Sequence, residues 1–139
     1  MKNLTAPVVW LIDDAENDRI LYQEAFRGWQ TPLKLRAFGD AEEALLSLRR
    51  QVSPSVVPDL IVLDLHMPRV NGFAFLAELK RDPRLREIPV FVVSDHPVTR
   101  EVLGDYGLSA QACLRKPADL AGMVAIAAGL EEFWRAAKD

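Results

Sequence analysis

The stretch that decides the fold is Pro58-Asp59-Leu60-Ile61-Val62-Leu63-Asp64-Leu65-His66-Met67-Pro68. Its apolar run, residues 60–63, is continuous rather than alternating and is bounded by breakers. Such a run predicts a strand that is buried on both faces. Asp64 then stands at the carboxyl end of this strand, and ligands of an open parallel sheet bind at that edge, where the strand order reverses. Asp64 is therefore the first candidate for a functional residue.

Shorter apolar runs predict four more strands, at Val8–Ile12, Leu33–Phe38, Ile88–Val93 and Ala110–Leu114. Apolar spacing and capping signals between the runs predict five helices. In chain order they cover residues 15–28, a stretch from residue 41 onward, and residues 73–81, 98–106 and 118–136. Five strands that alternate with five helices indicate an α/β fold, a doubly wound parallel sheet with helices on both faces.

The composition suits one domain covering residues 1–139, because half of the residues are hydrophobic and a chain of this length buries about two thirds of its unfolded surface. A formal net charge of -3, with basic residues interleaved among acidic ones, argues against a nucleic-acid partner. A single cysteine, Cys113, excludes an internal disulfide. The sequence shows neither a signal peptide nor the roughly 20 apolar residues of a membrane span, so we expect a cytoplasmic protein.

Polar residues follow four of the predicted strands, namely Asp13, Asp14, Asp64, Ser94 and Lys116. In a doubly wound sheet these strand ends share one edge. Three carboxylates that converge there repel one another and raise at least one pKa unless a cation joins them. Oxygen ligands select a hard ion, and Mg²⁺ suits a site with few carboxylates because it commonly takes a phosphate oxygen as a further ligand. Lys116 and the hydroxyl of Ser94 complete the groups that phosphoryl transfer requires, namely a nucleophile, a divalent ion and a cationic donor around the transferred oxygens.

Each of these residues has a simpler explanation when taken alone. A strand-terminal aspartate such as Asp64 is usually a turn former or a helix cap, and the pair Asp13-Asp14 could cap the first helix. Ser94 and Lys116 alone indicate almost nothing. The whole set at corresponding strand ends is specific evidence for a functional site, because the probabilities of independent coincidences multiply.

Through these residues, the chain resembles a response-regulator receiver domain of two-component signalling. The resemblance covers nearly the whole chain and rests on four matching pieces, residues 9–14, 60–72, 92–94 and 114–117. It implies a flavodoxin-like sheet of strand order 2-1-3-4-5. The chain also looks like the small stand-alone regulators that pair with phytochrome-type kinases. Because it stops after the fifth predicted helix, we expect no output domain and expect it to signal by binding.

The resemblance also implies a role for each site residue. Asp64 would be phosphorylated from a phosphohistidine on a sensor histidine kinase. Asp64 and Asp14 would ligate Mg²⁺ directly, together with the backbone carbonyl of His66, and Asp13 would act through water. Ser94 would hydrogen-bond the phosphoryl group and Lys116 would pair with it, next to a cis Lys116–Pro117 bond.

The sequence departs from the family pattern at the position three residues before the lysine. The family usually has an aromatic switch residue there, and this chain has Cys113. We interpret Cys113 as a small core residue, with a redox role as the alternative. We expect the hydroxyl of Ser94 to transmit phosphorylation through the fourth helix instead of through a rotating ring.

Two histidines, His66 and His96, each lie two residues beyond a site residue. We expect them to tune the lifetime of the aspartyl phosphate and to make it depend on pH near a pKa of roughly 6.5. They could instead be loop residues without a role, or ligands of a softer metal.

Residues 121–130 of the last predicted helix carry no charge. If residues 120, 124, 127 and 130 face the sheet, Met123, Ile126, Phe133 and Trp134 remain partly unsheltered. We therefore expect a homodimer through the C-terminal helix region.

Three classes of function remain open. The first is a phosphoryl-accepting signalling module that catalyses only its own phosphorylation and dephosphorylation and is not an enzyme for an external substrate. The second is a phosphatase of the haloacid dehalogenase type, which would need a second aspartate where this chain has His66. The third is an adaptor that keeps the fold and acts independently of phosphorylation.

Overall fold

The computed structural model describes residues 6–50, 57–65, 72–95 and 98–138. Strands and helices alternate along the chain: β1 Val8–Ile12, α1 Glu16–Phe26, β2 Lys34–Phe38, α2 Ala41–Arg50, β3 Leu60–Asp64, α3 Gly72–Arg81, β4 Val90–Ser94, α4 Arg100–Asp105, β5 Ala112–Arg115 and α5 Leu120–Lys138. The strands form one parallel sheet of order β2-β1-β3-β4-β5. The predicted fold class and strand order are confirmed.

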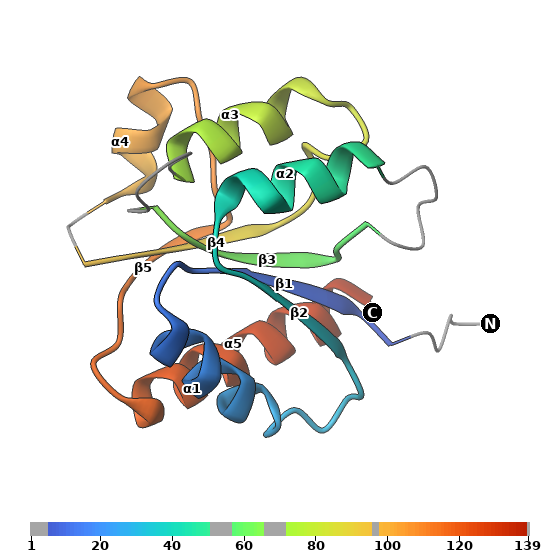
Figure 1. The fold of residues 1–139 in the computed structure, drawn as a ribbon, viewed down its shortest axis with the longest axis vertical. Coiled ribbons are helices and arrows are strands. Elements are labelled where there is room, and N and C mark those ends of the chain that lie inside the picture. The colour runs from blue at the N-terminus through green and yellow to red at the C-terminus, as the bar shows by residue number, and fades with distance from the viewer. Residues whose placement is uncertain (1–5, 51–56, 66–71, 96–97, 139) are drawn as a thin grey trace.

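The sheet lies between two helical layers, with α1 and α5 on one face and α2, α3 and α4 on the other (Figure 1). Every residue of β3 and β4 is buried, which explains why their apolar runs are continuous. Along β3, Ile61 and Leu63 join the core beneath α2 and α3, whereas Leu60 and Val62 join the core beneath α1 and α5. The two central strands therefore anchor both cores.

Helix α2 lies as its sequence predicts. The carboxylate of Asp40 accepts hydrogen bonds from the backbone N–H groups of Glu42 and Glu43, at 2.7 and 3.1 Å, and so caps the helix. The helical spacing of the sequence predicts one apolar stripe, and all of its residues are buried, namely Ala41, Ala44, Leu45 and Leu48. A strongly two-sided pattern thus fixed the orientation of this helix.

Helix α5 is rotated relative to the prediction. Met123 is buried with Ala127 and Leu130, whereas Leu120 and Val124 are 37% and 44% exposed. Because this helix is apolar on most of its circumference, its spacing does not define a unique buried face. The rotation is set by packing, in which the indole Nε1–H of Trp29 donates to the carbonyl oxygen of Ala127 at 2.7 Å.

Helix α1 also differs in which residues it buries. Helical spacing predicts an apolar side that contains Ile20, Ala25 and Phe26. Ile20 is nevertheless 54% exposed, and Tyr22 is buried in its place. Helix α4 is shorter than expected and begins after Thr99, whose hydroxyl accepts a hydrogen bond from the N–H of Val102 at 3.1 Å. None of the helices described has the length and apolarity that crossing a membrane would require.

Candidate functional site

Buried polar side chains mark the carboxyl edge of the sheet. Tyrosine aside, the buried polar or charged residues in the described part of the chain are Asp13, Asp64 and Ser94, each at most 5% exposed. Burial of an ionisable group is unfavourable unless a partner or a function compensates for it. All three lie at the ends of β1, β3 and β4, where the sequence predicts a site.

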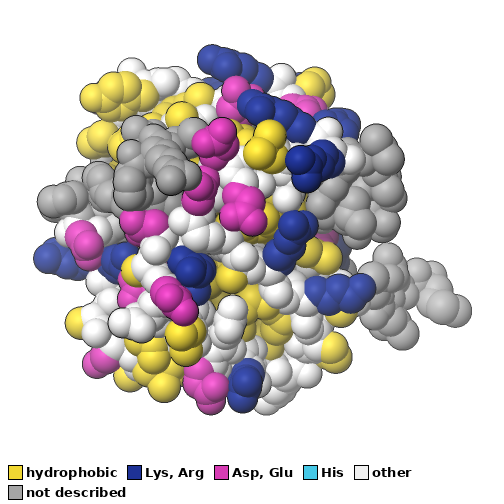
Figure 2. Space-filling model, viewed as in Figure 1, with side chains coloured by type: hydrophobic (Ala, Val, Ile, Leu, Met, Phe, Trp, Pro, Cys, Tyr) yellow, Lys and Arg dark blue, Asp and Glu magenta, His cyan; other side chains and the backbone are white. Residues whose placement is uncertain are grey.

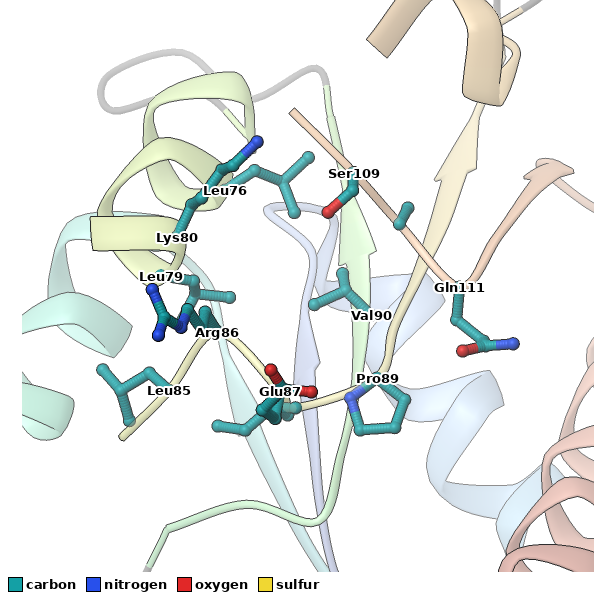
Figure 3. A pocket seen from close by; sticks show the side chains of 12 residues that line it. Leu76, Leu79, Lys80, Leu85, Arg86, Glu87, Pro89, Val90, Ser109 and Gln111 are labelled. Carbon is teal, nitrogen blue, oxygen red and sulfur yellow. The ribbon is translucent and has the colours of Figure 1, made fainter. Parts of the chain in front are cut away.

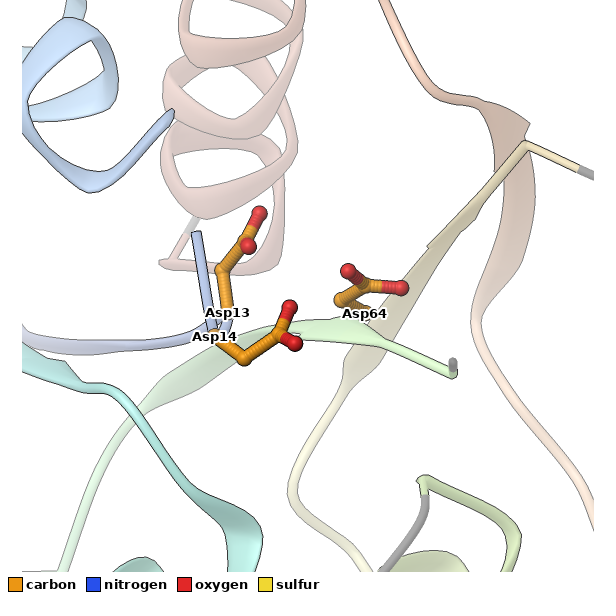
Figure 4. Close-up of side chains that lie close together, drawn as sticks. All are labelled: Asp13, Asp14 and Asp64. Atoms are coloured by element: carbon orange, nitrogen blue, oxygen red, sulfur yellow. The ribbon is translucent and has the colours of Figure 1, made fainter. Parts of the chain in front are cut away.

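Three carboxylates converge at this edge. Figure 4 shows Asp13 and Asp14 following β1 and lying next to Asp64 at the end of β3. One oxygen from each lies within 4.8 Å of the others. Opposite ligands of an octahedral Mg²⁺ stand about 4.2 Å apart, since each Mg–O distance is about 2.1 Å. Small side-chain rotations would therefore let the three carboxylates share a divalent cation, and oxygen donors suit Mg²⁺, Ca²⁺ and Mn²⁺ alike.

Among the described carboxyl groups at this edge, that of Asp13 has a clearly raised pKa. Burial raises its pKa from the ordinary value of 3.8 to about 6, and repulsion from Asp64 and Asp18 adds to the rise. A hydrogen bond from the N–H of Ala15, at 2.9 Å, and the charge of Lys116 partly oppose it. The convergence of carboxylates predicts such a raised pKa through repulsion, but burial is the larger cause of the rise.

Lys116 carries the positive charge of the site. Its Nζ lies 3.2 Å from Asp64 Oδ2, 2.9 Å from Asp18 Oδ2 and 3.7 Å from Asp13 Oδ2. Burial lowers the pKa of this ammonium, but the three carboxylates outweigh burial and hold the pKa well above its ordinary value. The backbone N–H of Lys116 donates to the carbonyl oxygen of Ser94 at 2.9 Å, which ties the lysine to the end of β4. Lys116 is therefore a permanent cation beside Asp64.

Asp18 is not among the predicted site residues, because helical spacing places it away from the apolar residues of α1. This residue lies four positions after Asp14, which is one helical turn, so the helix that leaves the site returns its carboxylate toward Lys116. The (i, i+4) spacing from a predicted ligand was the available signal.

Other predicted residues have mixed outcomes. Cys113 lies in β5, partly buried against the core beneath α2, α3 and α4, and burial raises the pKa of its thiol. His66 and His96, with the predicted carbonyl ligand of His66, lie outside the described residues. The cis Lys116–Pro117 bond implied by the resemblance is wrong, because every described peptide bond is trans, the form that most X–Pro bonds take.

A cavity of about 210 Å³ lies elsewhere, between α3 and the chain that enters β4 (Figure 3). Its lining includes Leu76, Leu79, Pro89 and Val90, so it lies at the amino end of β4, whereas the carboxylates lie at the opposite edge of the sheet. In the space-filling view, acidic side chains lie among basic ones on the side on which β1 and β3 end (Figure 2).

The fold and the cluster define a class of protein. Residues 9–128 match the response regulator receiver domain. The chain therefore belongs to this family of two-component signalling proteins, which take phosphoryl groups from histidine kinases.

Among its relatives is the response regulator Rcp1 of Synechocystis sp., which is 32% identical over 129 residues, 91% of this chain and 88% of that protein. The crystal structure of the phosphorylated cyanobacterial phytochrome response regulator RcpA superposes with a TM-score of 0.80 at 33% identity, covering 97% of this chain and 98% of that one. The Mn²⁺-bound form of Rcp1 gives 0.78 at 32% identity, over 92% and 94%. The chain is thus close to phytochrome-associated regulators.

Proposed function

We propose that Asp64 accepts a phosphoryl group from the phosphohistidine of a sensor histidine kinase, and that the phosphorylated chain signals by binding a protein partner or a second copy of itself. The observation that carries the proposal is the position of Asp64. Its carboxylate lies 3.2 Å from the ammonium group of Lys116 and close enough to two further carboxylates to share a cation with them. A buried carboxylate with these neighbours has the surroundings that a phosphoryl acceptor needs.

In the proposed reaction, a carboxylate oxygen of Asp64 forms a bond to phosphorus while the P–N bond of the phosphohistidine breaks. The leaving imidazole nitrogen keeps the electron pair. The ammonium of Lys116 pairs with the oxygens of the transferred group, and the hydroxyl of Ser94 donates to them from the end of β4. Mg²⁺ held by Asp13, Asp14 and Asp64 would supply the positive charge that lets the anionic phosphoryl group approach an anionic nucleophile.

Two further observations support a type of kinase and a mode of output. The similarity to RcpA, a phytochrome response regulator, supports a phytochrome-type kinase as the phosphoryl donor. Leu120 and Val124 of α5 are exposed apolar side chains that a second copy could cover, which supports a homodimer through the C-terminal helix. This face differs from the expected one, because Met123 is buried.

Incubation of the protein with Mg²⁺ and acetyl phosphate, followed by intact mass measurement, tests the function. We expect the mass of one phosphoryl group to be added per chain, with slow loss after the donor is removed. Release of many equivalents of phosphate per chain would instead indicate a phosphatase. No adduct and no turnover would indicate an adaptor.

Cys113→Ala tests whether the residue at the usual aromatic position transmits the signal. The side chain is small and only partly buried, so we expect a loss of about 1 kcal/mol or less in unfolding free energy. We expect the phosphoryl adduct to form as in the wild type. Hydrogen exchange in α4 should still change when beryllofluoride, a phosphoryl analogue, is added with Mg²⁺. An adduct without any change in α4, where the wild type shows one, would assign the transmission to Cys113.

A further inference from the structure

The carboxylate of Asp18 makes the shortest contact to the lysine of the site. Its Oδ2 lies 2.9 Å from Lys116 Nζ, closer than the oxygens of Asp64 at 3.2 Å and Asp13 at 3.7 Å. The three oxygens able to share a cation come from Asp13, Asp14 and Asp64, so Asp18 stands outside the described metal cluster. Its contact with the site is therefore through the ammonium.

The surroundings of this ion pair shield it partly from water. The side chain of Asp18 is 24% exposed and that of Lys116 is 14% exposed. The neighbouring guanidinium of Arg19 donates to the backbone carbonyl of Asp13 at 2.8 Å. Tyr22, one turn further along α1, is buried, and burial together with the charge of Asp13 raises the pKa of its hydroxyl, so it remains neutral. Lys116 is the cation that Asp18 contacts among the described residues.

We propose that Asp18 competes with the phosphoryl group of Asp64 for Lys116 and so limits how tightly the site holds that group; this rests on the proposed function. An ammonium group has three N–H donors and one charge, which three carboxylates share in this structure. A phosphoryl group on Asp64 adds negative charge beside Asp18 and needs the same ammonium. The fixed charge of Asp18 therefore raises the free energy of the phosphorylated form relative to the free form.

A purely structural role for Asp18 predicts the opposite sign. If this carboxylate only held Lys116 in place, its removal would misplace the lysine and weaken the binding of a phosphoryl group. Asp18→Asn separates the two roles, because asparagine keeps the size of the side chain and an oxygen that can accept from Lys116, but removes the charge.

The test is the affinity for beryllofluoride at saturating Mg²⁺, measured by calorimetry on the full chain. We expect Asp18→Asn to lower Kd by about threefold to tenfold, as expected for removal of one partly screened charge. Asp18→Glu, which keeps the charge, should bind like the wild type. Glu16→Gln is the matched control, because Glu16 is an exposed acid in the same first turn of α1, and it should leave Kd unchanged.

The outcomes separate the two proposals. An unchanged or higher Kd for Asp18→Asn, with a wild type that binds normally, would overturn the competition between Asp18 and the phosphoryl group. A wild type that binds no beryllofluoride and takes up no phosphoryl group would overturn the proposed function itself. The phosphorylated fraction with acetyl phosphate gives a second readout, which should be higher for Asp18→Asn than for wild type.

Discussion

Asp64→Asn is expected to form no phosphoryl adduct when it is incubated with Mg²⁺ and acetyl phosphate. Asparagine has almost the same shape as aspartate and keeps an oxygen toward Lys116, which lies 3.2 Å from the wild-type carboxylate. Its amide is neutral, however, and does not act as a nucleophile toward phosphorus. The expected effect is therefore complete loss of the adduct with little change in the fold, measured by intact mass.

The matched control is Asp105→Asn, which makes the same chemical change on the exposed surface of α4. This variant should gain the same mass as the wild type. A phosphoryl group found on Asp64→Asn, located by peptide mapping, would place the acceptor on another residue. Loss of the adduct in both variants would point to a general loss of structure, which thermal unfolding would show.

Asp13→Asn is expected to stabilise the metal-free protein near neutral pH. Burial raises the pKa of Asp13 from 3.8 to about 6, which corresponds to about 3 kcal/mol of unfolding free energy lost when the carboxyl group ionises. Asparagine avoids this ionisation and keeps an oxygen that can accept from the N–H of Ala15. Removing a predicted metal ligand should thus raise stability when no metal is bound.

The pH dependence follows from the direction of this shift. Because the pKa is higher in the folded than in the unfolded chain, the folded state binds the proton more tightly. The stabilisation that protonated Asp13 provides is complete below pH 3.8 and is lost as the pH rises through about 6. The advantage of Asp13→Asn over the wild type should therefore grow between these values and remain constant above them.

Urea unfolding in the presence of EDTA, at several pH values, measures this difference. Asp14→Asn is the matched control, because it removes the same charge from the neighbouring residue, whose side chain is exposed. Its advantage should be much smaller. An Asp13→Asn variant that is less stable than the wild type at pH 7 and above would contradict the predicted burial penalty.

The strands could be predicted from the sequence because their signal is local. The five apolar runs gave every strand to within two residues at each end. The ends of these runs also placed Asp13, Asp14, Asp64 and Lys116 at one edge, because the carboxyl ends of parallel strands lie together. The buried face of α2 was predicted equally well, since one side of that helix is apolar and the other carries the charged residues.

The buried faces of α1 and α5, the helices that follow β1 and β5 in the chain, were predicted less well. Between residues 121 and 130, α5 has no charged residue to mark its solvent side. Spacing alone therefore could not show that Met123 is buried and Val124 is exposed. Helical spacing places Asp18 away from the apolar residues of α1, yet its carboxylate pairs with Lys116, which follows β5.

The sequence by itself therefore determined the order of strands and helices and the residues at the carboxyl edge of the sheet, because strand runs and strand ends are encoded in neighbouring residues. Only the tertiary structure decided the rotation of α1 and α5, and with it the burial of Met123 and the pairing of Asp18 with Lys116. The rotation of a helix against a sheet depends on packing between residues that are distant in sequence, and an apolar helix leaves several rotations open.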